Sequence, residues 1–205
     1  MIEKRRVIVG LMMTFAATAG AQNAGEERLG SASLGVSIVK PKDWHIRSSN
    51  ETLALAKMLK PSDPEAERRW RDAMRAPLVV VAKYPAAHQG LNPAFRVDVK
   101  PYGSVPSNAS GAAIVEAMAN MLKANFKDMQ VEKGPLDLSL KGQKAGYIKL
   151  NYVNVSTTGF RFPTTAEFWA IPRKDHYVVL GGSYGTGDAA VEADMAAIVK
   201  TVSFD

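Results

Sequence analysis

The strongest constraint on the fold is the order in which helix and strand patterns follow one another after residue 110. Helical spacing of apolar residues predicts a long helix that begins after Ser110 and ends at Gly134-Pro135. A second helix is predicted to begin at Asp188, its N-cap. Between the two helices, strand patterns occupy segments 136–140, 147–155, 165–171 and 177–183. Consecutive strands without intervening helices favour an α+β fold, with a mostly antiparallel sheet and helices packed on it.

The first half of the chain adds further strands and one charged helix. Strand patterns occupy segments 34–39, 44–47, 78–82 and 95–99, whereas 51–59 fits either strand or helix. Ser62 followed by Glu65 forms a capping box, which predicts a helix near 62–75 with only a narrow apolar stripe.

Residues 1–21 have the pattern of a secretory signal peptide. Lys4, Arg5 and Arg6 precede an uncharged apolar run, and Ala19-Gly20-Ala21 supplies the small residues of a cleavage site. The run is shorter than the roughly 20 apolar residues of a membrane-spanning helix. We therefore expect a periplasmic or secreted protein that does not span the membrane, with a flexible leader at 22–33 and a single domain at 34–205.

Composition excludes several chemistries. The chain contains no cysteine, which rules out disulfides, thiolate metal sites, a cysteine nucleophile and lipidation after the signal. The formal net charge is +6. Removing 1–21 takes away three cations and one anion, which leaves +4. This mild and dispersed charge does not indicate nucleic-acid binding, but it leaves open a weak contact with anionic lipid or wall polymer.

Two segments of the domain resemble the PsbP-like superfamily, including the bacterial DcrB-type envelope proteins. One is the opening strand that closes on Pro41-Lys42-Asp43-Trp44. The other is the ending, in which the strand from 176 to 180 leads through a Gly/Ser loop and a helix to 198–204. The resemblance implies an α/β/α sandwich in which helices flank the sheet, with the helix near 62–75 as an insertion. It also implies a non-enzymatic binding module or adaptor.

Candidate catalytic residues are few. Gly181-Gly182-Ser183-Tyr184-Gly185 fits the G-x-S-x-G pattern of a nucleophile elbow, but no histidine follows Ser183 and the next helix starts several residues later. His45, His88 and His176 lack the spacing of metal ligands. We therefore predict no catalytic residues, no metal and no cofactor, and keep a small envelope serine hydrolase using Ser183 as an alternative.

Aromatic residues next to arginine are the better candidates for binding. Trp70 lies between Arg69 and Arg71 on the charged helix, and Phe160-Arg161-Phe162 lies in a predicted turn. Such pairs are favoured as anchors in protein interfaces. We predict that these six residues contact an envelope protein or an apolar ligand.

Overall fold

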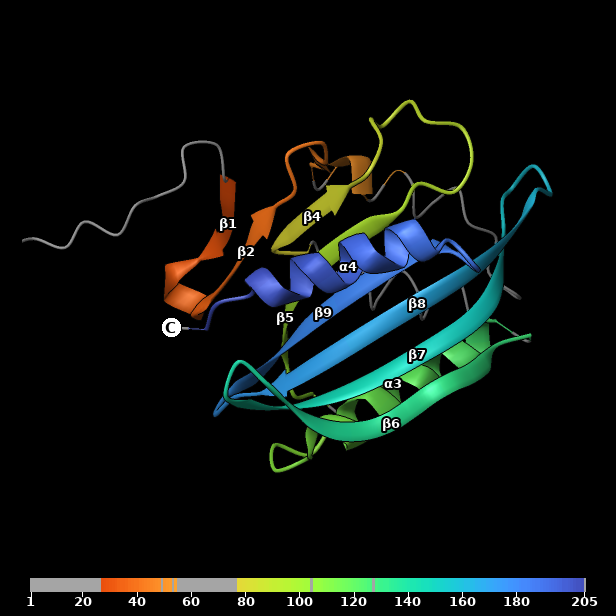
Figure 1. Ribbon diagram of the computed structural model, residues 1–205. Helices are drawn as coiled ribbons and strands as arrows, with labels where there is room; N and C mark the ends of the chain where they lie inside the picture. Colours follow the sequence, from red (N-terminus) through yellow and green to blue (C-terminus); the bar gives the residue numbers. More distant parts are fainter. Residues whose placement is uncertain are drawn as a thin grey trace, which may run out of the picture.

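A seven-stranded antiparallel sheet forms the centre of the protein (Figure 1). The computed structural model describes residues 27–48, 50–52, 54, 77–103, 105–126 and 128–204. The strand order is β3-β4-β5-β9-β8-β7-β6. In chain order, the strands are β3 His45–Ile46, β4 Val79–Ala82, β5 Ala94–Pro101, β6 Gln130–Leu140, β7 Gln143–Val155, β8 Arg161–Pro172 and β9 His176–Gly185.

One helix covers each face of this sheet. On the first face, α3 (Gly111–Asn125) packs over a core that includes Ile148, Leu150 and Val179. On the second face, α4 (Ala189–Thr201) packs over a core that includes Trp169 and Leu180. We call these the α3 face and the α4 face. The arrangement confirms the predicted α+β fold with helices on both sides of a mostly antiparallel sheet.

A small second sheet extends the α4 face. It consists of β1 (Glu27–Ser31) and β2 (Val36–Lys40), joined by the 3-10 turn η1 (Ala32–Leu34). Buried Val36 and Ile38 from β2 join the core beneath α4. Residues 27–33, for which we predicted a flexible leader, are therefore ordered here, because β1 pairs with β2 along its whole length.

Both helix starts agree with the sequence. The Ser110 side chain accepts a hydrogen bond from Ala113 N, and the Asp188 side chain accepts one from Val191 N, as expected of N-caps. Asp137 on β6 adds a second acceptor for α3, at 2.8 Å from Ala112 N. Side-chain acceptors thus stabilise the first turn of each helix.

The end of α3 and the start of β6 differ from our prediction. The helix ends at Asn125 rather than at Gly134-Pro135, and β6 runs from Gln130 through that dipeptide. Helical spacing continued past the true end because Phe126 and Met129 still pack into the core from a non-helical connection. Pro135 is tolerated because β6 is an edge strand whose pairing with β7 shifts register on either side of Lys133.

The predicted helix near 62–75 lies outside the described residues, as does most of segment 51–59. Within the part of the chain that the structure describes, no helix combines the length and apolarity needed to cross a membrane.

Glycines set how closely the helices approach the sheet. A Cβ on Gly146 would lie 1.9 Å from the backbone of Gly111, so α3 and β7 touch backbone to backbone. On the opposite face, Gly182 of β9 faces Met195 of α4, whose sulfur would lie 3.1 Å from an added Cβ. The first contact leaves no room for any side chain.

We therefore predict that Gly146→Ala destabilises the fold by about 3 kcal/mol or more, because α3 must move away from the sheet. The free energy of unfolding in urea measures this loss. Gly185→Ala is the matched control, since a Cβ at that strand position meets nothing within 4 Å. Equal stability of the two variants would contradict the backbone contact.

Candidate functional site

The residues at 160–162 lie at the tip of the hairpin that joins β7 and β8, which projects from the body of the molecule (Figure 1). The turn is held by Ser156, whose N–H donates to Phe160 O at 2.9 Å and whose Oγ accepts from Phe160 N at 3.0 Å. Phe160 is nevertheless 68% exposed. The structure thus presents a large aromatic side chain to solvent on an ordered turn.

The neighbours of Phe160 extend this exposed tip. The Phe162 ring centroid lies 6.5 Å from that of Phe160. Arg161 forms a long ion pair of 3.8 Å with Asp128, and both side chains are largely exposed. Exposed pairs of this kind contribute little to stability, so the Arg161 guanidinium remains accessible. The tip therefore brings two aromatic rings and a cation together.

More aromatic side chains continue from the tip along the α3 face. Phe162 lies on the same face of the sheet as Tyr152, diagonally across the β7–β8 pair. The Tyr152 ring lies 4.4 Å from Phe126 at the end of α3, and all three are only partly buried. Burial raises the pKa of Tyr152 to about 12. We call Phe126, Tyr152, Phe160 and Phe162 the aromatic strip.

Beyond the strip, the α3 face carries a charged pair on β5. Arg96 donates to both carboxylate oxygens of Asp98, each at 2.6 Å. Asp98 is buried and Arg96 is partly exposed. Gly181 of β9 lies beneath Arg96 and Phe168, which a Cβ there would meet at 3.2 Å. The pair places a fixed, half-accessible guanidinium on the same face as the strip.

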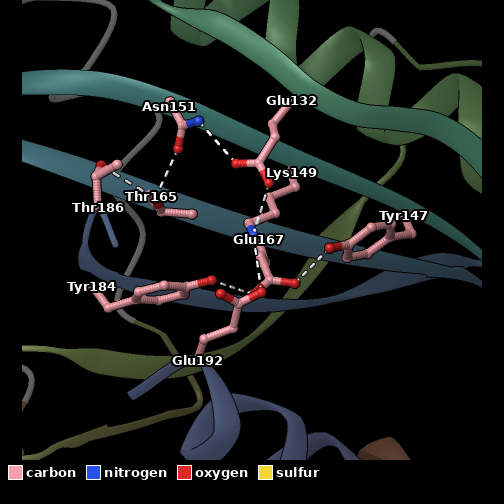
Figure 2. A network of polar contacts seen from close by, with 9 residues as sticks. All are labelled: Glu132, Tyr147, Lys149, Asn151, Thr165, Glu167, Tyr184, Thr186 and Glu192. Carbon is pink, nitrogen blue, oxygen red and sulfur yellow. Dashed lines mark hydrogen bonds and ion pairs between the residues drawn. The ribbon is translucent and has the colours of Figure 1, made fainter. Parts of the chain in front are cut away.

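The α4 face carries a different feature, a buried polar network (Figure 2). The Glu167 carboxylate accepts hydrogen bonds from Tyr147 at 2.5 Å and from Tyr184 at 2.7 Å. Burial, and then the bond to Glu167, raise the pKa of both tyrosines above the ordinary value. Glu167 is therefore enclosed by two neutral donors.

Lys149 connects the rest of this network (Figure 2). Its Nζ lies 2.9 Å from Glu192 on α4 and 3.0 Å from Glu132 on β6. Asn151 also donates to Glu132, at 2.9 Å, and accepts from Thr165 at 2.7 Å. These contacts engage both carboxylates and connect β6, β7, β8 and α4.

Ser183 does not form a nucleophile elbow. It lies within β9, half-buried and paired with Ala94 of β5 and Ala166 of β8. His45 is in register with it but three strands away, which corresponds to roughly 14 Å. That separation is too large for a hydrogen bond between the two side chains.

The remaining histidines are equally dispersed. His88 stacks on Tyr84 with ring centroids 4.3 Å apart, and His176 begins β9. Over the described residues, no group of three or more histidines and carboxylates could hold a metal ion.

The structure describes three of the six predicted contact residues. Phe160, Arg161 and Phe162 form the hairpin tip, whereas Trp70, Arg69 and Arg71 lie outside the described residues. Sequence reasoning missed Tyr152 and Phe126 as neighbours of the tip. The available signal was the alternation along 147–155, which puts Tyr152 on the face of the strand opposite to Lys149 and Asn151.

The sheet with α3 and α4 on its two faces defines a PsbP-like fold. The solution structure of cyanobacterial PsbP (CyanoP) from Synechocystis sp. PCC 6803 matches with a TM-score of 0.51 and 10% sequence identity, covering 93% of this chain and 99% of that one. The crystal structure of LpqN, involved in cell envelope biogenesis of Mycobacterium tuberculosis, matches with a TM-score of 0.47 and 12% sequence identity. This match covers 87% of this chain and 90% of LpqN. No family model and no curated protein sequence matches the chain. At this identity the likeness shows the fold alone.

Tyr184→Phe should lower the free energy of unfolding by about 1.5–3 kcal/mol, because the buried Glu167 carboxylate loses one of its two donors. Urea denaturation at pH 7 measures the change. Tyr84→Phe, which removes a hydroxyl from a 37% exposed ring, is the control and should remain near wild type. Equal effects would contradict the role of Glu167.

The network also predicts a pH dependence. Hydrogen bonds from Lys149 and then Asn151 hold the pKa of Glu132 below its ordinary value of 4.5. A carboxyl group with a lowered pKa stabilises the fold above its unfolded pKa and loses this contribution as pH falls through its folded pKa. Lys149→Gln should therefore lower stability at pH 7 and flatten its decline below about pH 5. Urea midpoints from pH 7 to pH 3 test this, with exposed Lys144→Gln as the control; parallel curves would refute it.

Proposed function

We propose that the protein is an extracytoplasmic, non-catalytic binding module that docks a protein partner on the tip of the β7–β8 hairpin. The observation that carries this proposal is Phe160, which is 68% exposed on a hydrogen-bonded turn. Aromatic side chains supply much of the apolar area buried in interfaces, and most of the Phe160 side chain is left uncovered by this fold.

The surroundings of Phe160 fit a protein partner better than a small ligand. The aromatic strip lies along the projecting β7–β8 hairpin and the end of α3, and it lines neither of the two hollows found in the described residues, whereas sites for small molecules are concave. Arg161 adjoins the two phenylalanines, and arginine beside aromatic residues is typical of interface anchors. Arg96 extends the same face with a second, fixed guanidinium.

An extracytoplasmic location is supported by the signal-peptide pattern at 1–21 and by the resemblance to DcrB-type envelope proteins. The lack of cysteine means that the fold needs no disulfides in an oxidising compartment. A non-catalytic role is supported by Ser183, which lies within a regular strand far from His45. Trp70, with Arg69 and Arg71, is proposed as a second contact of the same partner.

Photo-crosslinking from the hairpin tip tests the proposal. A photoreactive amino acid at position 160 should give a discrete crosslinked protein in intact cells. The same group at Val131, which is 49% exposed on β6, should not. With the group at position 160, Arg161→Ala should weaken the crosslink by about tenfold if the guanidinium is an anchor.

Two outcomes would count against this role. No crosslink from position 160 would remove the tip as a docking site. The same product from positions 131 and 160 would indicate capture without a specific surface.

A further inference from the structure

A hollow lies at the end of the molecule opposite the hairpin tip, between the C-terminal turn of α4, the β1–β2 sheet and the turn between β6 and β7. Its volume is about 530 Å³, within the usual range of ligand sites. The hollow is open to solvent. Its apolar lining comes from Val39, Val202 and Phe204.

Three cations from three separate elements surround this hollow. Arg28 comes from β1, Lys141 from the β6–β7 turn and Lys200 from the last turn of α4. No aspartate or glutamate lines the hollow among the described residues. The Arg28 guanidinium donates one hydrogen bond, to Ser37 Oγ at 3.0 Å, which leaves further N–H groups to donate.

Local structure does not account for all three charges. Lys200 complements the negative end of the α4 dipole, which is a sufficient structural reason for that one residue. Lys141, however, has a φ of 51°, a left-handed conformation in which hairpin turns favour asparagine or glycine. The turn conformation therefore does not favour a lysine at this position.

Two residues that line the hollow, Thr201 and Ser203, already form hydrogen bonds within the protein. Thr201 Oγ1 accepts from Val39 N at 2.9 Å and donates to Ile198 O at 2.7 Å. The backbone of Ser203 pairs with Ser37 in both directions. A ligand in the hollow would thus meet the three cationic side chains and the apolar side chains of Val39, Val202 and Phe204.

We propose that this hollow binds a ligand that carries a phosphate group next to an apolar part. A phosphate monoester carries close to two negative charges at pH 7 and has three acceptor oxygens to share among three cationic donors, whereas a carboxylate has one charge and two oxygens. A soluble organic phosphate monoester and a lipid whose headgroup is a phosphate monoester both have this chemistry. Because β7 runs between the two ends, such a ligand would not compete with a protein at the hairpin tip.

Phenyl phosphate is the probe, titrated into the purified protein at low ionic strength and followed by amide NMR shifts and by calorimetry. Saturable binding is expected, with shifts confined to residues around 28, 141 and 200–204. Lys141→Gln and Lys200→Gln should each raise the Kd by about tenfold or more. Lys123→Gln, the same charge change on exposed α3, should leave it unchanged.

Vesicles distinguish the two sources of the phosphate. Binding to phosphatidic acid vesicles but not to phosphatidylglycerol or phosphatidylcholine vesicles, together with phenyl phosphate binding, assigns a lipid headgroup. Phenyl phosphate binding without vesicle binding assigns a soluble phosphate. No saturable binding of phenyl phosphate, or an equal loss in Lys123→Gln, would overturn the proposal, since only diffuse charge attraction would remain.

Discussion

The backbone contact between Gly111 and Gly146 fixes the position of α3 on the sheet. Because the first turn of the helix lies backbone to backbone on β7 and cannot come closer, its fifteen residues cover a set length of β6, β7 and β8. The helix ends beside Tyr152, and the sheet continues beyond it into the β7–β8 hairpin. The exposed tip and the aromatic strip both follow from where this helix is anchored.

The second helix is held by polar contacts as well as by packing. Met195 packs on Gly182, while Glu192 reaches Lys149 across the face of the sheet. Beside this contact, the buried Glu167 carboxylate accepts hydrogen bonds from Tyr147 and Tyr184. Buried polar groups are tolerable only when they are satisfied, so these bonds fix the positions of the three side chains on the α4 face of the sheet.

The sequence was sufficient for features that depend on neighbours along the chain. Ser110 and Asp188 cap their helices, and the strand pattern over 147–155 lies within β7. The sequence was insufficient for features that depend on residues far apart along the chain. Phe126 and Met129 kept helical spacing beyond the helix because the core, not the helix, requires them. Likewise, nothing near Arg28 in the sequence indicates Lys141 and Lys200, which only the folded sheet brings beside it.

The irregular pairing of β6 has a consequence for how the molecule behaves among its own copies. An edge strand offers unpaired backbone groups to which another strand can add. Here the register shifts around Lys133 and the proline at 135 interrupt that row, and the opposite edge, β3, is only two residues long. Neither edge of this sheet therefore offers a long, regular row of backbone groups with which a strand of another copy could pair. This disfavours polymerisation by addition of strands.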